Sequence, residues 1–339
     1  MLKILSPLGV RPHAVKAACL VGDVEDSENQ VSFAITGQQS DILGRVLSEN
    51  QRRKVQKFVV ATSIDFSYEK SVRFLSDTLR SGGYSAVLSI GDTKTSLCAA
   101  LAAKSANVML VHYESGLRST IRTLEERIRR KIDRITDLHL CYNEQCAVTL
   151  NAEGVSRSRI QVVGSLYEES LATSLNEASS YDGMYEGMIV VALHRKENRW
   201  NAQNAAALSR QLNDFSQKKL LICHPSNSNH MISSVKSHSD QWIVAKEMEN
   251  PFFVRVLSDA TAVVTDSAGI AEQSFLLNKP TIILRDCTER PWILGPRSRL
   301  AGLSKLSSVL SDVLARSSSM SPQLDCKASR RILEVLGSI

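Results

Sequence analysis

Short apolar runs recur along the first half of the chain, and each is followed by an amphipathic segment of helical length. The runs are apolar throughout rather than alternating with polar residues, which is typical of strands buried on both faces of a parallel sheet. The strands predicted in this way are Lys3–Leu8, Val31–Thr36, Phe58–Thr62, Ala86–Ile90, Val108–His112, Leu138–Tyr142 and Ile160–Val163. Strands that alternate with helices predict an α/β domain.

A polar interval rich in Ser, Glu, Tyr and Gly interrupts this rhythm at about 166–187, after which the same alternation starts again. The second set of predicted strands is Met188–Leu193, Leu220–Cys223, Trp242–Ala245, Ala262–Thr265 and Thr281–Leu284. We therefore expect two Rossmann-like, doubly wound parallel-sheet domains, at residues 1–166 and 187–320. A final helical pattern within 321–339 is compatible with either domain, and we expect it to pack back on the first.

Length and composition agree with this division. A chain of 339 residues suits two domains, and 43% hydrophobic with 22% charged residues is the composition of a globular protein. The longest apolar runs, such as Ile189–Leu193, are far shorter than a membrane-spanning helix. The first apolar stretch, Leu2–Val10, is interrupted by Lys3 and predicts a strand rather than a secretory leader.

Charge and cysteine usage narrow the class of protein further. The net charge is +6, but basic residues alternate with acidic ones, as in Glu125–Arg134, which indicates a solvated helix face rather than a nucleic-acid surface. Seven cysteines without a paired spacing predict free thiols and a cytoplasmic protein. The histidines His224, His230 and His238 lack neighbouring carboxylate ligands, so neither a metal nor a cofactor is expected.

Many polar side chains directly follow a predicted strand. In open parallel sheets, ligands bind beyond the carboxyl ends of the strands, where helix N-termini present free N–H groups. The residues in this position are Arg11, Gln38, Gln39, Asp92, Glu114, His194, Asp266, Ser267 and Arg285. Their concentration at the strand ends predicts a cleft between the two domains that holds an anionic nucleotide.

The segment TDSAGIAEQSF, residues 265–275, ends a buried strand and begins a helix. Ser267 is suited to cap that helix, and Gly269 allows the backbone to approach a ligand. The positive end of the helix dipole favours a phosphate group. Phosphate binding and simple helix capping both account for this segment.

The segment GVRPHAVK, residues 9–16, brings two cations to the start of another helix. Arg11 and Lys16 oppose the helix dipole there unless an anion joins them. Phosphate contact is the expected reason, and pairing of Arg11 with a carboxylate of the same domain is the alternative.

Candidates for proton transfer are Asp92, Glu114, Glu125 and His194, each of which taken alone also fits a helix cap or a surface ion pair. Glu114 directly follows the apolar run VMLVHY, and a carboxylate at a buried strand needs a partner or a task. Glu126 has the spacing of ordinary helical ion pairs with Arg129 and Arg130, so Glu125 is the candidate of that pair.

Taken together, GVRPHAVK, TGQQ, GDTKTS, HYESGLR, EERIRR, ALHRKEN, TDSAGIAEQ and RDCTERPW resemble, in order and approximate spacing, the motifs of the non-hydrolysing UDP-N-acetylglucosamine 2-epimerases. The resemblance spans nearly the whole chain. It implies the two-domain architecture of GT-B glycosyltransferases, a UDP-sugar as the substrate and a homodimer as the assembly.

The resemblance also implies a reaction and the residues that perform it. The reaction is inversion at C2 of a UDP-linked N-acetylhexosamine through elimination and re-addition of UDP. The proton-transfer set is Asp92, Glu114, Glu125 and His194. The UDP- and substrate-binding set is Arg11, Lys16, Gln38, Arg129, His224, Phe253, Ser267, Ala268, Gly269, Glu272, Gln273 and Arg290. Within that set Phe253 is expected against the uracil and Gln273 against the ribose.

Three departures from the family pattern bear on these expectations. Ala268 stands where a second Gly is usual, Gln273 stands where a Glu is usual, and the Gly/Gln segment linked to allosteric substrate binding has no clear counterpart near 62–70. Three other functions stay open beside the epimerase. They are a hydrolysing relative that releases UDP and free sugar, a GT-B transferase, and a non-catalytic UDP-sugar-binding protein.

Overall fold

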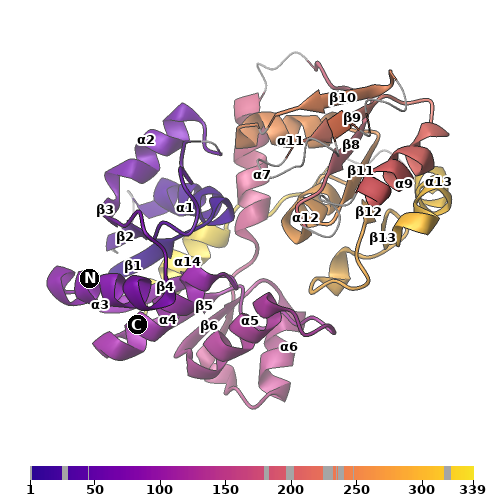
Figure 1. Cartoon of the computed structure of the whole chain (residues 1–339). Helices are drawn as coiled ribbons and strands as arrows, with labels where there is room; N and C mark the ends of the chain where they lie inside the picture. Colours follow the sequence, from indigo (N-terminus) through magenta and orange to yellow (C-terminus); the bar gives the residue numbers. More distant parts are fainter. Residues whose placement is uncertain are drawn as a thin grey trace. The chain divides into compact units, whose positions relative to one another are not determined.

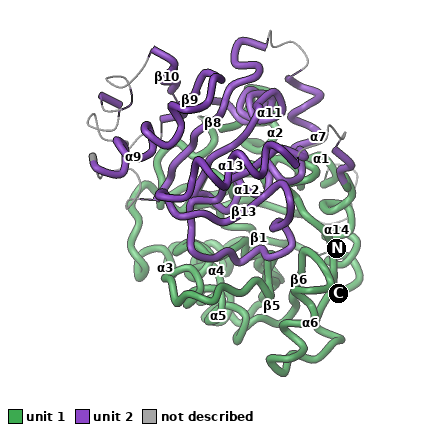
Figure 2. The backbone as a smooth tube through the Cα atoms, turned by 90° about the vertical axis from the view of Figure 1, so that its right-hand side faces the viewer, with its two compact units in different colours: residues 1–170, 325–339 green, residues 171–324 purple. Residues whose placement is uncertain are grey.

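The structure is a computed structural model of the chain, and it describes residues 2–24, 30–44, 46–178, 183–195, 202–223, 232–233, 235, 240–246, 248–316 and 322–339. The described chain divides into two compact units, shown in different colours in Figure 2. Unit 1 comprises Met1–Ser170 and Asp325–Ile339, and unit 2 comprises Leu171–Leu324. Each unit is built on one parallel sheet, which is the predicted fold class.

Unit 1 contains a sheet of seven parallel strands in the order β3-β2-β1-β4-β5-β6-β7. The strands are β1 Lys3–Leu8, β2 Gln30–Ile35, β3 Val59–Thr62, β4 Ala86–Ile90, β5 Met109–Tyr113, β6 Leu138–Cys141 and β7 Ile160–Val162. The helices are α1 Arg11–Val24, α2 Glu49–Lys57, α3 Tyr68–Gly82, α4 Lys94–Ala106, α5 Leu124–Ile135, α6 Glu144–Ala152 and α14 Ala328–Gly337. A further helix, α7 Leu166–Glu177, begins in unit 1 and continues into unit 2. All seven strands predicted for the first half are confirmed within one or two residues.

The strand order of unit 1 changes direction between β1 and β4. Since crossovers between parallel strands are right-handed, α1 and α2 cover one face of the sheet, and α3, α4 and α5 cover the other. A hydrophobic cluster joins alternate strand residues such as Leu5 and Val87 to Leu79 and Ile132 on this second group of helices. The loops after β1 and β4 therefore lie at the point where ligands bind in such sheets.

Unit 2 contains a sheet of six parallel strands in the order β10-β9-β8-β11-β12-β13. The strands are β8 Ile189–Ala192, β9 Lys219–Ile222, β10 Trp242–Ala245, β11 Ala262–Thr265, β12 Thr281–Ile283 and β13 Ser298–Leu300. The helices are α9 Ala202–Asn213, α11 Asn250–Asp259, α12 Ala268–Leu276 and α13 Leu306–Ala315. The five strands predicted here are confirmed, and β13 was not predicted.

Alternate residues of β8 enter two different hydrophobic clusters, which shows that helices cover both faces of this sheet as well. Ile189 and Val191 belong to a cluster with residues of α9 and α13, whereas Val190 and Ala192 belong to a cluster with residues of α11 and α12. The direction of strand order changes between β8 and β11, so the loops after these two strands are the candidate ligand-binding edge of unit 2.

The last helix, α14, returns to unit 1 and packs against α1 (Figure 1). It buries Ile332, Leu333 and Leu336. The start of α14 is held by α7, because the Ser329 N–H donates to Glu169 Oε2 at 2.9 Å. No helix among the described residues is long and apolar enough to cross a membrane.

Candidate active site

Four strands of unit 1 that lie side by side, β1, β4, β5 and β6, each bring one functional side chain to the carboxyl edge of the sheet. Lys16 comes from α1 after β1, Asp92 follows β4, Glu114 follows β5 and Tyr142 follows β6. Neighbouring parallel strands end at the same edge, so the topology brings these residues together. The sequence predicted the first three as site residues and did not single out Tyr142.

Glu114 lies at the centre of this group. Its side chain is buried, and its Oε1 atom contacts both the Lys16 ammonium and the Tyr142 hydroxyl. Its backbone has a φ of +73°, which is unusual for a residue with a side chain and turns Glu114 out of the line of β5. Of the partner or task expected for a carboxylate at this strand end, the structure provides a partner, Lys16. The anion that joins Lys16 within this chain is Glu114.

Gly91 provides the room for the second carboxylate oxygen of Glu114. A Cβ atom at position 91 would lie 2.8 Å from Glu114 Oε2, which is closer than real Cβ contacts allow. Gly91 also has a φ of +69°, a conformation that strains any L-residue with a side chain. Since Gly91 directly precedes Asp92, this contact places two of the predicted proton-transfer carboxylates on adjoining loops.

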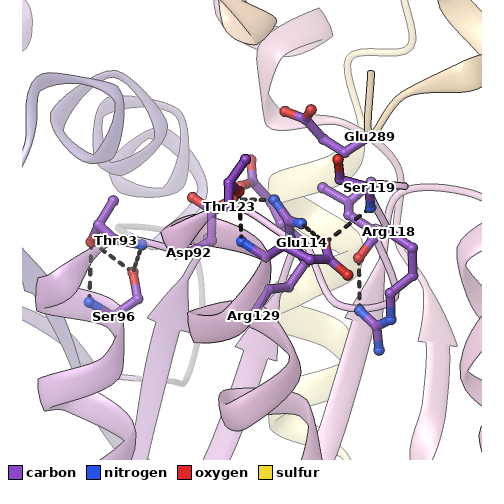
Figure 3. A network of polar contacts seen from close by, with 12 residues as sticks. Asp92, Thr93, Ser96, Glu114, Arg118, Ser119, Thr123, Arg129 and Glu289 are labelled. Carbon is purple, nitrogen blue, oxygen red and sulfur yellow. Dashed lines mark hydrogen bonds and ion pairs between the residues drawn. The ribbon is translucent and has the colours of Figure 1, made fainter. Parts of the chain in front are cut away.

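Asp92 forms an ion pair with the guanidinium of Arg129 on α5, and the two side chains point toward one another in Figure 3. Arg129 is also paired with Glu126, with 2.7 Å between Nη1 and Oε2. Glu126 further accepts hydrogen bonds from Arg130 Nε at 2.7 Å and from the Ser119 N–H at 2.9 Å. Glu126 therefore fixes Arg129 against Asp92.

The acidic and basic side chains of α5 divide between surface and interior. Glu126, Arg129 and Asp133 are buried, so the predicted solvated helix face is wrong for this side of α5. Each buried charge has an opposite charge beside it, which removes most of the cost of burial. Glu125 is exposed in the first turn of α5, next to the paired Glu126.

Asp133 holds the loop that carries Glu114. It accepts hydrogen bonds from His112 Nδ1 and Ser115 Oγ, both at 2.6 Å, and from the Gly116 N–H at 3.3 Å, and Arg118 is 2.7 Å from its second oxygen. Burial on its own would raise the pKa of Asp133, but the charge and hydrogen bond of His112, together with Arg118 and Ser115, hold the pKa of that carboxyl well below its usual value. Asp133 is therefore an ionised anchor.

His112 connects the Glu114 loop to the Asp92 loop. Its Nε2 atom lies 2.9 Å from the Gly91 carbonyl oxygen, and its Nδ1 atom lies against Asp133. The imidazole bridges a backbone carbonyl of one loop and the carboxylate that anchors the other. One buried imidazole thus fixes the two loops relative to each other, and neither His112 nor Asp133 was predicted as part of the site.

Side-chain amides in the loop after β2 bind the start of α4, which follows β4, and the start of α1, which follows β1. Gln38 Oε1 accepts hydrogen bonds from the Thr95 N–H and hydroxyl at 2.8 and 2.9 Å, and Gln39 Oε1 accepts one from the Arg11 N–H at 3.1 Å. Arg11 is the first residue of α1. His13, two residues later, is fully buried, and its burial followed by the charge of Lys16 lowers its pKa to about 3, so its ring is neutral at neutral pH.

In unit 2 the loops after β8 and β11 are joined by Asp266. Its carboxylate accepts hydrogen bonds from the His194 N–H at 2.7 Å and the Arg195 N–H at 3.1 Å. Asp266 is buried, and the His194 side chain is exposed. The structure thus fixes the backbone of the predicted proton-transfer residue His194. His224, predicted to bind the substrate, lies outside the described residues.

Ser267 occupies the N-cap position of α12, as predicted, but its hydroxyl makes no capping hydrogen bond. The Ser267 N–H is instead bound to the Thr265 hydroxyl at 3.1 Å. Ser267, Ala268 and Gly269 are all half-buried at this helix end. An N-terminus without a side-chain cap, in the loop where the sheet changes direction, suits a bound phosphate.

Arg290, predicted to contact the substrate, is buried in unit 2 between two carboxylates. Its Nε atom is 2.9 Å from Glu272 Oε2, and its Nη1 atom is 2.9 Å from Glu289 Oε1. Arg285 pairs with the other oxygen of Glu289 at 2.9 Å. The two cations and two anions balance, and Glu272 is part of this network. Gln273 is buried on α12, and Phe253 is partly buried on α11.

Comparison with known proteins identifies the family. The model of the UDP-N-acetylglucosamine 2-epimerase family matches residues 24–337. The chain belongs to this family. It is 25% identical over 382 residues to the UDP-N-acetylglucosamine 2-epimerase of Salmonella borreze, covering 100% of this chain and 99% of that protein.

One further relative and one solved structure of similar fold extend the comparison. The UDP-2,3-diacetamido-2,3-dideoxy-D-glucuronate 2-epimerase of Pseudomonas aeruginosa is 25% identical over 305 residues, with 86% of this chain and 85% of that protein covered. The crystal structure of Methanocaldococcus jannaschii UDP-GlcNAc 2-epimerase in complex with UDP-GlcNAc and UDP has a TM-score of 0.87 at 21% identity, with both chains fully covered. The resemblance inferred from the motifs is confirmed.

Proposed function

We propose that the protein interconverts UDP-N-acetylglucosamine and UDP-N-acetylmannosamine as a non-hydrolysing 2-epimerase. The observation that carries the proposal is the pair of carboxylates, Asp92 and Glu114, that the sheet edge of unit 1 brings onto adjoining loops with Gly91 between them. Membership of the epimerase family supplies the class of substrate. One relative is named for a UDP-linked diacetamido glucuronate, so the substituents of the sugar are the part of the substrate that the assay must identify.

The reaction needs a base, an acid and a site for a departing anion. A proton leaves C2 while the bond between C1 and the diphosphate oxygen breaks, UDP departs with the electron pair, and C1 and C2 become joined by a double bond. A proton then adds to C2 from the opposite face and UDP returns to C1. The hydrogen at C2 is not acidified by a neighbouring carbonyl, so proton removal depends on a positioned base and on stabilisation of the leaving diphosphate.

The two units supply these functions separately in our proposal. In unit 1, Asp92 and Glu114 are the proton-transfer pair, with Glu125 as a third candidate from α5. In unit 2, the uncapped N-terminus of α12 at Ser267 binds the diphosphate, and His194 completes the proton-transfer set. Arg11 at the start of α1 adds positive charge for the departing anion.

Incubation of the purified protein with UDP-N-acetylglucosamine in heavy water tests the proposal. We expect deuterium at C2 of the recovered UDP-sugars, detected by mass spectrometry and proton NMR, and both epimers in the mixture. The Asp92→Asn and Glu114→Gln variants, which keep the size of each side chain, are expected to lose this exchange.

The same assay distinguishes the other functions. Free UDP in stoichiometric amounts with no returning UDP-sugar would identify a hydrolysing enzyme, and turnover that needs an acceptor would identify a transferase. Absence of exchange with every UDP-N-acetylhexosamine of a panel that includes the diacetamido glucuronate would refute the epimerase. The homodimer and the cytoplasmic location implied by the resemblance remain predictions, and size-exclusion chromatography tests the first.

A further inference from the structure

Tyr142, the residue after β6, makes a contact that the reaction can use. Its ring is buried, and its hydroxyl donates a hydrogen bond to Glu114 Oε1. The same oxygen receives the ammonium of Lys16. Two strong donors therefore converge on one oxygen of a carboxylate that the proposed reaction uses for proton transfer.

The position of the Tyr142 hydroxyl is set by its surroundings. The ring packs edge-on against Tyr113, with 5.4 Å between ring centroids and an interplanar angle of 77°. Tyr113 is itself fixed, because its hydroxyl accepts the Leu166 N–H at 2.8 Å and donates to the Gly164 carbonyl oxygen at 3.2 Å. Because the Tyr142 ring is already held in the folded protein, its hydroxyl is in place before the reaction and no side-chain entropy is lost when the reaction occurs.

Lys16 is held with comparable firmness. Its side chain is buried, and its ammonium lies 4.8 Å from the centre of the Tyr167 ring, within cation–π distance. The Tyr142 hydroxyl approaches Oε1 from the loop after β6, the strand beside β5, and the Lys16 ammonium approaches it from α1, the helix after β1. The carboxylate of Glu114 is thereby oriented so that Oε2 faces Gly91, the residue before Asp92.

A buried carboxylate is costly unless donors satisfy it, and hydrogen bonds to its ionised form favour that form. A general base must be both ionised and correctly aimed. We propose that Tyr142 is a positioning residue for proton transfer, which with Lys16 keeps Glu114 ionised and directs Oε2 toward the Asp92 loop. This inference rests on the proposed epimerase function and adds a residue that the family motifs did not indicate.

The variant Tyr142→Phe removes only the hydroxyl and keeps the packed ring. A hydrogen bond to a charged group contributes about 1.5–3 kcal/mol, so we expect kcat for epimerisation to fall by about 10- to 100-fold. We expect UDP affinity, measured by calorimetry, to change less than about twofold, because UDP lacks the sugar carbon from which the proton is removed. The primary isotope effect with C2-deuterated substrate should rise, since proton removal becomes the slower step.

Tyr84→Phe is the matched control, because Tyr84 is a buried tyrosine of the same unit that lies before β4, at the edge of the sheet opposite to Glu114. We expect it to leave kcat, the isotope effect and the pH dependence of kcat unchanged. An equal loss of kcat in both variants, with no change in isotope effect, would reduce Tyr142 to a packing residue and overturn the inference. So would wild-type kcat in Tyr142→Phe.

A readout without substrate separates this inference from the proposed function. The carboxyl carbon of Glu114, labelled with carbon-13 and assigned by comparison with Glu114→Gln, can be titrated by NMR in the substrate-free protein. We expect Tyr142→Phe to move its titration to higher pH, and an unchanged titration would overturn the inference even if the protein is an epimerase. A shifted titration in a protein without exchange would instead refute only the epimerase function.

Discussion

Gly91→Ala is the sharpest test of the geometry around Glu114. The added methyl group would lie 2.8 Å from Glu114 Oε2, and the backbone φ of +69° adds strain of about 1–2 kcal/mol for a residue with a side chain. Relief of the overlap requires the Glu114 carboxylate to move. Because misplacement of a reacting group by about 1 Å can lower a rate about 100-fold, we expect C2 exchange to fall by about that factor.

Gly83→Ala separates strain from displacement. Gly83 ends α3 with a φ of +63°, close to that of Gly91, but a Cβ atom there meets nothing within 4 Å. Both glycines belong to unit 1, so both variants should lose about 1–2 kcal/mol of stability from backbone strain. Only Gly91→Ala should lose exchange. The heavy-water assay gives the rate, and denaturant unfolding gives the stability. Exchange in Gly91→Ala within about threefold of Gly83→Ala would refute the proposed placement of Glu114.

Three further predictions follow from charges and caps. The pKa of Asp133 is lower in the folded protein than the value of about 3.9 in an unfolded chain, so its ionised form stabilises the fold above a pH of about 3.9, and this contribution is lost as the pH falls through the folded pKa. Asp133→Asn should therefore be destabilised by about 3–5 kcal/mol at pH 7. In acid, the difference in unfolding temperature between this variant and the wild type should shrink. Glu126→Gln should unfold at a lower temperature than the wild type, because it leaves the buried Arg129 with less charge compensation. Glu125→Gln, at an exposed position, should keep its stability and lose C2 exchange. The opposite ranking of the two unfolding temperatures would contradict the structure. Ser267→Ala should change stability by less than the roughly 0.5–2 kcal/mol typical of a lost cap, because the Ser267 hydroxyl does not cap α12. The same variant should bind UDP more weakly in calorimetry. A large loss of stability with unchanged UDP affinity would identify Ser267 as an ordinary capping residue.

The strands were predictable because both faces of each sheet are covered by helices. A strand such as β4, Ala86–Ile90, is buried at every residue and is therefore apolar at most positions. β13, Ser298–Leu300, was missed because it is short, lies at the edge of its sheet and contains Ser and Arg, so nothing in its composition distinguishes it from a loop. The predicted strand ends then led directly to Asp92 and Glu114.

The partners of the site residues were not predictable in the same way. Tyr142 and Asp133 acquire their roles only because β6 lies beside β5 and because one side of α5 faces the loop after β5. Strand order and helix orientation are properties of the whole sheet, and a single sequence without repeats does not report them. The alternating charges of α5 therefore suggested a solvated surface, although its buried members pair with residues that are about 20 to 40 positions away, such as Asp92 and His112.

The discontinuity of unit 1 sets the order in which the chain can fold as it is synthesised. Unit 2 is contiguous and is complete once Leu324 has emerged from the ribosome. Unit 1 must wait for α14, the last helix, which packs on α1 and is bound by Glu169. Since a domain folds as a unit, unit 1 can complete its folding only after α14 has been synthesised, although its strand β1 is synthesised before unit 2. A nascent chain stopped before Ala328 would leave uncovered the part of α1 around Asp23, to which Ser329 of α14 is hydrogen-bonded in the complete unit.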